Sequence, residues 1–268
     1  MTVALGIDIG GTKIAAGVVD AATGSVLDRR RVQTRPERGG AAVLGDCAAL
    51  VAELGDGRLP VGIGLCELVD LTGRPTSADT IDWRGVDPAT AIDAPRVVVE
   101  SDLRAAARAE ARFGRGAGAS PFLFAMVGTG ASACLVVDGR PYAGARGEAL
   151  VLGAPPVEAV ASGTALARAA GLERAEDVLA DPALAPLVDA AATALGGALA
   201  VLANALDPSL VVLGGGLGAQ RGFSERVERA CQALLAYPRI PPLPVVSSTL
   251  GPDGGVVGAA LVALGDGD

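Results

Sequence analysis

The chain has 268 residues, half of them hydrophobic, and a formal net charge of −8. This length suits one large domain or two lobes, and the scattered glycines and prolines argue against a low-complexity or disordered protein. The acidic balance argues against nucleic acid or an anionic membrane surface as the main partner. Apolar stretches of spanning length are all interrupted by charges or turn signals, so we expect a cytoplasmic protein without a membrane span.

Histidine is absent, and the four cysteines lie far apart, at positions 47, 66, 134 and 231. A zinc site is therefore not expected, and Ser-His-Asp, Cys-His and metal-His chemistry are excluded. Any general base must then be an aspartate or a glutamate. We expect the cysteines to be reduced and mostly buried.

The first half of the chain has the pattern of a mixed α/β lobe. Strands are predicted at 3–9, 14–19, 26–34, 61–65 and 95–101, and helices at 39–54 and 102–114. The first three strands follow one another without a helix, so the lobe begins with a hairpin and a third strand.

The second half repeats this order. A hairpin is predicted at 122–127 and 133–139, and it is followed by helices at 156–171, 174–180, 184–206, 223–236 and 254–264 and by strands at 209–216 and 243–248. Two hairpin-led halves indicate an internal duplication, with a cleft between two α/β lobes. We place the lobes at 1–116 and 117–268, and we expect the last helix to pack back on the first lobe.

Three glycine-rich turns follow predicted strands. The sequence DIGGTK (8–13) can present backbone N–H groups, the Thr12 hydroxyl and the ammonium of Lys13, the only lysine, to a phosphate, while Asp8 can serve Mg²⁺. An ordinary Gly-Gly hairpin turn is the alternative. The turns GTGAS (128–132) and LGGG (213–216) favour the phosphate-binding interpretation, because three such corners in a duplicated chain are stronger evidence than one.

The same motifs carry a resemblance to a known family. In this order and spacing, DIGGTK, VESDLRAAARAE, MVGTGAS, the Glu-x-x-x-Ser-Gly run and LDPSLVVLGGG resemble the ROK family of bacterial sugar kinases, regulators and relatives, in the actin-like ATPase superfamily. The similarity spans essentially the whole chain. It implies two ribonuclease H-like lobes and phosphoryl transfer from ATP and Mg²⁺ to a sugar hydroxyl, with the first two turns on phosphates and the third on adenosine.

The resemblance also implies roles for individual residues. Asp102 matches the catalytic base, which accepts the proton of the attacking hydroxyl, although a helix N-cap is an alternative role for it. Asp8 would hold Mg²⁺ through water. The residues that would bind the nucleotide and its metal are Asp8, Gly10, Gly11, Thr12, Lys13, Gly128, Thr129, Gly130, Gly214, Gly215 and Gly216.

Departures from the family pattern lie around the substrate. The substrate residues implied by the resemblance are Glu67, Asp79, Ser101, Asp102, Glu148 and Glu158. Asp79 and Ser101 stand where the family has asparagine, and Glu67 belongs to a Cys-Glu pair that replaces Pro-Gly. Glu67 and Asp79 could instead be acidic surface residues, and Glu148 and Glu158 could face solvent. The family's histidine and zinc-binding cysteines are missing after Gly147, so no zinc is expected.

We therefore predict an ATP-dependent kinase that phosphorylates the exocyclic primary hydroxyl of a hexose or of a sugar-like cyclitol. A C7-cyclitol is favoured over glucose, because the missing histidine normally contacts ring hydroxyls near the anomeric centre. A homodimer is expected from the family. The alternative is a non-catalytic sugar-binding or regulatory protein, but regulators of this family usually carry an N-terminal helix-turn-helix, which we do not expect here.

Overall fold

The computed structural model describes residues 2–55, 57–150 and 155–265. The chain divides into two compact units. Unit 1 comprises Met1–Phe113, Ala143–Ala149 and Asp253–Asp268, and unit 2 comprises Gly114–Tyr142 and Leu150–Pro252. The division therefore differs from a single boundary at 116/117, because two later segments belong to the first unit.

Unit 1 is built on a mixed five-stranded sheet with the order β3-β2-β1-β4-β5. Its strands are β1 (Val3–Ile9), β2 (Lys13–Asp20), β3 (Ser25–Gln33), β4 (Val61–Leu65) and β5 (Val97–Ser101). Its helices include α1 (Gly40–Gly55), α2 (Asp102–Phe113) and α9 (Gly254–Leu264). β1, β2 and β3 are antiparallel neighbours, whereas β4 runs parallel to β1 and β5 runs parallel to β4.

Unit 2 repeats this topology with the order β8-β7-β6-β9-β10. Its strands are β6 (Phe122–Val127), β7 (Ala131–Val137), β8 (Arg140–Pro141), β9 (Leu210–Gly214) and β10 (Val245–Ser247). Its helices include α3 (Pro155–Ala161), α4 (Gly163–Ala170), α5 (Ala175–Ala180), α6 (Ala185–Leu206), α7 (Gly215–Gly218) and α8 (Arg221–Ala233). The antiparallel and parallel pairings also match those of unit 1, which confirms the predicted duplication of a ribonuclease H-like α/β sheet.

The predicted helix at 156–171 is in fact two helices. Ser162 separates α3 from α4, and its hydroxyl accepts a hydrogen bond of 3.1 Å from the amide of Ala165. A serine in this position satisfies an amide that the first turn of a helix leaves unpaired, so it starts a new helix.

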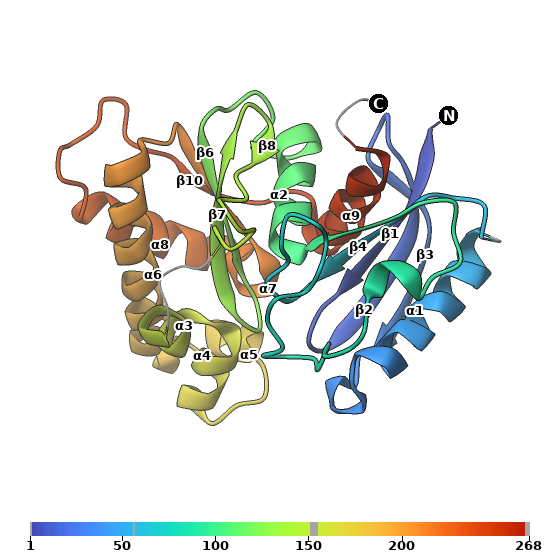
Figure 1. Cartoon of the computed structure of the whole chain (residues 1–268). Coiled ribbons are helices and arrows are strands. Elements are labelled where there is room, and N and C mark those ends of the chain that lie inside the picture. Colours follow the sequence, from blue (N-terminus) through green and yellow to red (C-terminus); the bar gives the residue numbers. More distant parts are fainter. Residues whose placement is uncertain (1, 56, 151–154, 266–268) are drawn as a thin grey trace. The chain divides into compact units, whose positions relative to one another are not determined.

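Helix α9 packs on the sheet of unit 1 with almost no space between the backbones. A Cβ atom on Gly62 of β4 would lie 1.8 Å from the carbonyl oxygen of Ala259, and one on Gly6 of β1 would lie 1.9 Å from that of Val256. On its other side, α9 contacts α2, and Figure 1 shows α9 beside α2, β1 and β4. A helix enclosed in this way is expected to be apolar all round, and residues 256–263 are all buried.

Unit 2 contains α6, the longest helix among the described residues, and its apolar run is interrupted by the charged Asp189. Residues Pro182–Leu206 are long and apolar enough, by length and composition alone, to cross a membrane. Within unit 2, however, its buried face joins the core formed with Leu123, Val211 and Phe223. A core helix of this kind passes the same test as a spanning helix, so the apolar run is accounted for by packing.

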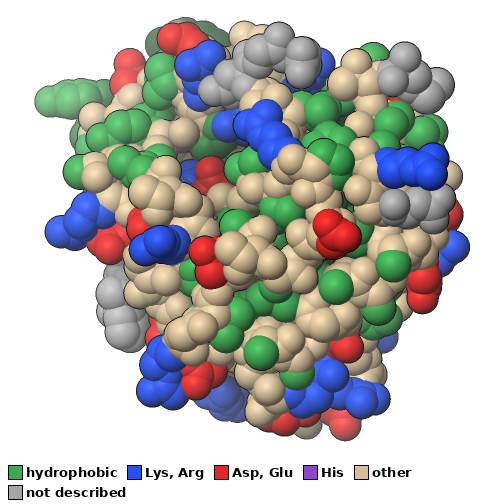
Figure 2. Space-filling model, turned by 45° about the vertical axis from the view of Figure 1, so that its right-hand side comes forward, with side chains coloured by type: hydrophobic (Ala, Val, Ile, Leu, Met, Phe, Trp, Pro, Cys, Tyr) green, Lys and Arg blue, Asp and Glu red, His purple; other side chains and the backbone are tan. Residues whose placement is uncertain are grey.

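On the face drawn in Figure 2, basic and acidic side chains are interspersed, so the net charge of −8 is not gathered there in one acidic patch. The four cysteines, all in the described part of the chain, form no disulfide; Cys47, Cys134 and Cys231 are buried and Cys66 is partly buried. This agrees with the expectation of reduced, mostly buried thiols.

The close packing of α9 makes a stability prediction. We expect Gly62→Ala to lower the free energy of unfolding by about 3 kcal/mol or more, because the new methyl group would collide with the α9 backbone. Gly45→Ala, at an exposed position of α1, is the matched control, since a Cβ there meets no atom within 4 Å. That change should stabilise the protein by about 0.5–1 kcal/mol. Urea denaturation measures both, and equal values for the two variants would contradict the packing.

Candidate active site

Asp8 is placed by the alternation of side chains along β1. Ile7 and Ile9 point to one face of the sheet and join the core that includes residues of α1. Asp8 points to the opposite face, where α9 begins, and a Cβ on Gly255 would lie 2.5 Å from its Oδ2. The N-terminal turn of a helix stabilises a carboxylate, so α9 both covers Asp8 and favours its charge.

Asp102 lies on the same face as Asp8. Asp8 is opposite Gly64 in the β1–β4 register, and a Cβ on Gly64 would lie 3.3 Å from the Cα of Asp102. Gly64 is in turn opposite Glu100 of β5, which leads directly into α2. Because Gly64 has no side chain, nothing from β4 separates the two carboxylates at the carboxyl ends of these parallel strands. Ligands of α/β sheets commonly bind at such strand ends.

Ser101, rather than Asp102, caps helix α2. The Ser101 hydroxyl accepts a hydrogen bond of 3.3 Å from the amide of Arg104, three residues ahead. This is the N-cap arrangement, and it corrects the alternative role suggested for Asp102. Asp102 occupies the first turn, where its Oδ1 accepts the amide of Leu103 at 2.6 Å. One carboxylate oxygen is therefore held and the side chain is not consumed in capping.

Burial raises the pKa values of both carboxyl groups, and the negative charge of Asp8 adds to the shift of Asp102. Burial, then the negative charge of Asp8, and to a smaller extent that of Glu67, raise the pKa of Asp102 to about 8, against the opposing hydrogen bond from Leu103. Burial raises the pKa of Asp8 to about 6, and the positive charge of Lys13 opposes this shift. Two carboxyl groups that resist ionisation together are typical of functional sites.

The same pair suits a divalent cation. Mg²⁺ in phosphoryl-transfer sites is bound by one or two carboxylates together with waters and phosphate oxygens. The negative charge of Asp8 raises the pKa of Asp102, and a cation held at Asp8 would offset that charge. The residues present therefore fit Mg²⁺. Among the described residues, no group of three or more His, Cys, Asp or Glu side chains that could hold a metal ion is found.

The first glycine turn is fixed from behind by Thr34. The Gly10 amide donates to the Lys13 carbonyl at 3.0 Å, and the buried Thr34 donates its hydroxyl to the Gly10 oxygen at 2.6 Å and its amide to the Thr12 oxygen at 3.1 Å. Within the described part of the chain, the amides of Gly11 and Thr12 donate to no protein group. Two consecutive free N–H groups make an anion-binding nest, and exposed Lys13 lies beside it.

Glu67 organises the loop that carries the predicted sugar contacts. Its buried carboxylate accepts the amides of Asp79 at 3.1 Å, Thr80 at 2.8 Å and Ile81 at 3.0 Å, together with the hydroxyl of Ser77. Thr80 brings this loop to the first glycine turn, since a Cβ on Gly11 would lie 2.9 Å from its Cγ2. The substrate contacts of Glu67 and of the fully buried Ser101 stay predictions, and the structure gives both side chains internal partners.

Asp79 and Glu148 have accessible side chains. Asp79 is exposed and contributes its amide, not its carboxylate, to the Glu67 network. Glu148 lies in the segment Ala143–Ala149 of unit 1 and pairs with Arg146, whose Nη2 is 3.0 Å from Glu148 Oε2. This pair is largely exposed, so it holds Glu148 only weakly.

In unit 2, the other glycine motifs meet at one corner. The Gly163 amide donates to the Gly128 carbonyl at 2.7 Å, and a Cβ on Gly215 would lie 2.4 Å from the Val127 oxygen. The turn Gly128–Gly130 therefore lies between the start of α4 and the start of α7. As in unit 1, the first amide of the turn is used internally, by Gly128 donating to Gly130, and those of the next two residues donate to no protein group among the described residues.

Glu158 is also at this corner, on α3. A Cβ on Gly130 would lie 2.5 Å from its Oε1, so its carboxylate is next to the second glycine turn. The side chain of Glu158 is exposed, as the alternative role for it assumed. Its predicted contact with a sugar stays a prediction.

Sequence reasoning missed the glycines that make room for the site. Gly64 separates the two aspartates without filling the space, Gly255 allows α9 to approach Asp8, and Gly163 lets α4 contact the second turn. Gly64 lies in the strand VGIGL, and Gly255 belongs to a pair of glycines. A glycine inside a strand or a glycine pair is a signal that another part of the backbone comes close. Gly163 had been treated only as part of a motif.

The raised pKa of Asp102 gives a stability prediction. The folded protein holds this proton up to about pH 8, whereas the unfolded chain releases it near pH 3.8, so the carboxyl group costs more stability as the pH rises between these values. In Mg²⁺-free buffer, Asp102→Asn should therefore be more stable than the wild type at pH 8, by about 1–3 kcal/mol, and the gain should shrink toward pH 4. Chemical denaturation at both pH values measures this. Exposed Asp93→Asn is the control, and a gain independent of pH would contradict the assignment.

The Glu67 network gives a second prediction. Glu67→Gln keeps the shape of the side chain but replaces one acceptor oxygen with an NH₂ group that faces backbone donors. We expect the free energy of unfolding to fall by about 1–3 kcal/mol. Asp70→Asn is the control, because Asp70 accepts the amides of Thr72 and Arg74 at 2.8 and 3.0 Å in a loop more open to water. A loss for Glu67→Gln no larger than that of the control would contradict the internal role.

Comparison with known proteins agrees with this geometry. The family model described as "ROK family" matches residues 4–266. The bifunctional enzyme NanE/NanK of Brucella melitensis is 32% identical over 97% of this chain, which spans about half of that relative (53%). The glucokinase of Streptomyces coelicolor is 30% identical, with 98% of each protein covered.

A solved structure extends the comparison to three dimensions. The ROK family glucokinase of Streptomyces griseus, in complex with glucose and AMPPNP, has a TM-score of 0.86 and 28% identity, and the match covers 96% of this chain and 98% of that one. Its bound nucleotide and sugar belong to that protein. The family model covers nearly the whole sequence, and both units have the fold that the motifs imply. The chain belongs to the ROK family.

Proposed function

We propose that the protein is an ATP-dependent kinase that phosphorylates a primary hydroxyl group of a hexose or of a sugar-like cyclitol. The observation that carries the proposal is the Asp8–Asp102 pair at the strand ends of unit 1. Both carboxyl groups have raised pKa values, and the free amides of the first glycine turn follow β1 directly. The name of the Streptomyces coelicolor relative, glucokinase, supports the same reaction class.

Asp102 is the group suited to accept the proton of the attacking hydroxyl. A general base works best when its pKa lies near the working pH, and a value of about 8 in the ligand-free protein meets this condition. The hydrogen bond from the Leu103 amide fixes Oδ1, so Oδ2 is the oxygen left to take the proton. Phosphoryl transfer depends mainly on positioning and charge neutralisation, which these fixed groups provide.

The phosphate chain would be bound by backbone groups. The amides of Gly11 and Thr12 in unit 1, and those of Thr129 and Gly130 in unit 2, are the consecutive free donors of the two turns. Gly214–Gly216 would face the adenosine, as the resemblance implies. When bound at Asp8, through water, Mg²⁺ would neutralise phosphate charge. Lys13 adds one further positive charge beside the first turn.

The substrate class within the sugars is the finer part of the proposal. The chain has no histidine, so the imidazole contact that the family uses near the anomeric centre is missing. A ring without an anomeric carbon, such as a C7-cyclitol, would not need that contact. Asp79 and Glu148 would contact its hydroxyl groups, and Glu158 would contribute from unit 2. We place the enzyme in the cytoplasm and expect it to act as a homodimer.

A screen of acceptors tests the function directly. ADP release, coupled to a chromogenic readout, should be stimulated by at least one member of a panel of hexoses, N-acetylhexosamines and cyclitols in the presence of ATP and Mg²⁺. Phosphorus NMR of the product should then place the phosphate on a primary carbon. A C7-cyclitol should exceed glucose in kcat/KM, and the reverse order would reject the finer assignment alone.

Replacing the base separates a kinase from a sugar-binding protein. Asp102→Ala should lower kcat by about 10²–10⁴-fold because the attacking hydroxyl loses its proton acceptor. Binding of the acceptor, measured by calorimetry, should change much less. If the wild type and Asp102→Ala release ADP at the same rate, the catalytic mechanism is wrong and the non-catalytic alternative is favoured.

A further inference from the structure

Arg104 is a buried charge that the mechanism above does not use. Its side chain is 2% exposed, and it lies on α2 two residues after Asp102. A guanidinium group is strongly hydrated in the unfolded chain and is buried only where its donors find partners. The partners of Arg104 come from three separate parts of unit 1.

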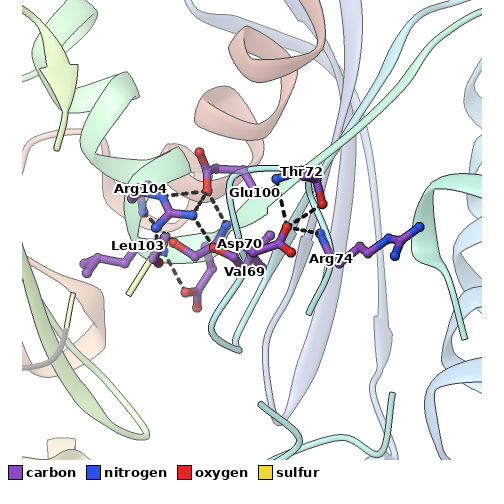
Figure 3. Close-up of polar contacts among 10 residues, drawn as sticks. Val69, Asp70, Thr72, Arg74, Glu100, Leu103 and Arg104 are labelled. Carbon is purple, nitrogen blue, oxygen red and sulfur yellow. Dashed lines mark hydrogen bonds and ion pairs between the residues drawn. The ribbon is translucent and has the colours of Figure 1, made fainter. Parts of the chain in front are cut away.

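The guanidinium reaches all three at once. Nε donates to Glu100 Oε1 at 2.6 Å, Nη2 donates to the Val69 carbonyl at 2.8 Å, and Nη1 donates to the Gly147 carbonyl. Nη2 also forms an ion pair with Glu100. Figure 3 shows Arg104 between Glu100 and Val69, with Leu103 alongside. The planar fork of arginine can serve several acceptors in fixed directions, which a lysine ammonium cannot do in the same geometry.

The two carbonyl groups come together because Gly147 lies directly on the chain at Val69. A Cβ on Gly147 would lie 2.2 Å from the Val69 oxygen and 2.8 Å from the Cα of Asp70, and its φ of +84° favours glycine. Asp70 in turn closes its own turn by accepting the amides of Thr72 and Arg74 (Figure 3). The Val69 side of the contact is therefore rigid.

The segment that Arg104 holds carries Glu148. Ala143–Ala149 belongs to unit 1, although the chain on both sides of it belongs to unit 2. The Ala149 amide donates to the Ala143 oxygen at 3.2 Å, so the segment is closed on itself as a loop. Glu148 lies between this closure and the Gly147 carbonyl, and its side chain pairs with the exposed Arg146.

We propose that Arg104 is a positioning residue that fixes the loop Ala143–Ala149, and with it Glu148, relative to Asp102. Helix α2 carries both the base and this guanidinium, so the base and the loop share one rigid element. Arg104 acts through the Gly147 carbonyl and does not touch substrate. The consequence for catalysis rests on the proposed function, in which Glu148 contacts the acceptor.

Hydrogen–deuterium exchange tests the positioning without any substrate. Arg104→Lys keeps the charge but cannot bridge the Glu100, Val69 and Gly147 acceptors together. We expect faster exchange in the peptide that covers residues 143–149, with the strands of unit 2 unchanged. Arg226→Lys is the matched control, because Arg226 pairs with Asp189 at the surface of unit 2. Unchanged exchange at 143–149 in a folded Arg104→Lys protein overturns the proposal.

Enzyme kinetics test the consequence for catalysis, namely that Arg104 positions Glu148 for contact with the acceptor. Arg104→Lys should raise KM for the acceptor by about tenfold or more while leaving KM for ATP unchanged, as expected for a misplaced contact. Glu148→Ala should raise the acceptor KM as well, and the double variant should resemble Glu148→Ala alone, because the loop then has no contact to position. The proposal is overturned if the effects of the two single variants on the acceptor KM multiply in the double variant, or if Arg104→Lys leaves the acceptor KM unchanged.

Failure of this inference can be distinguished from failure of the proposed function. If Arg104→Lys does not fold, the double variant Arg104→Met with Glu100→Gln removes both charges of this ion pair together and takes its place in the same measurements. If the wild type releases no ADP with any acceptor, the kinase proposal fails, and the exchange result alone then decides whether Arg104 fixes the loop.

Discussion

The repulsion between the Asp8 and Asp102 carboxyl groups is the constraint on which the site depends. Two negative charges in a region of low dielectric are unfavourable until a cation or a proton joins them. Two glycines make this arrangement of carboxyl groups possible. Gly64 adds no side chain between the two groups, and Gly255 lets the first turn of α9 approach Asp8. A site that is unfavourable when empty favours the ligand that relieves it, as sites for metal nucleotides do.

The rigidity around this pair comes from backbone packing and not from large side chains. Gly6 and Gly62 bring α9 against the sheet, and Gly258 brings it against α2, where a Cβ would lie 1.8 Å from the Ala105 oxygen. Helix α2 is therefore held on a surface that cannot slide without collision. Since α2 carries Asp102 and Arg104, and Ser101 at the end of β5 caps this helix, the proposed base and the guanidinium that binds the Gly147 carbonyl are held by one rigid element. The contacts of Glu67 with the amides of residues 79–81 extend this order to the loop beside the first glycine turn.

Local pattern predicted most of the fold. The hairpins, α1, α2, α9 and the duplication follow from apolar periodicity and glycine turns. The site role of Asp8 rests on the first glycine turn and that of Asp102 on the family resemblance, and both roles stay predictions. The rest depends on contacts between distant residues. The roles of Ser101 and Glu67 required knowing which amides lie within reach, and the Arg104–Gly147 bond joins residues 43 apart in sequence. The membership of Ala143–Ala149 in unit 1 has no local signal, because its neighbours on both sides belong to unit 2. The alternation along β1, by contrast, is a local signal, because it puts Asp8 on the face opposite to Ile7 and Ile9.

The position of α9 has a consequence for how the protein is made. Residues 254–264 cover β1 and β4, yet they leave the ribosome only after all of unit 2 has been synthesised. Until then, the face of the unit 1 sheet that α9 covers is exposed. All strands and helices of unit 2, by contrast, have been synthesised before α9 appears. During synthesis, unit 2 is the part that can complete its core first, and the apolar face of unit 1 is the surface that a chaperone would have to protect.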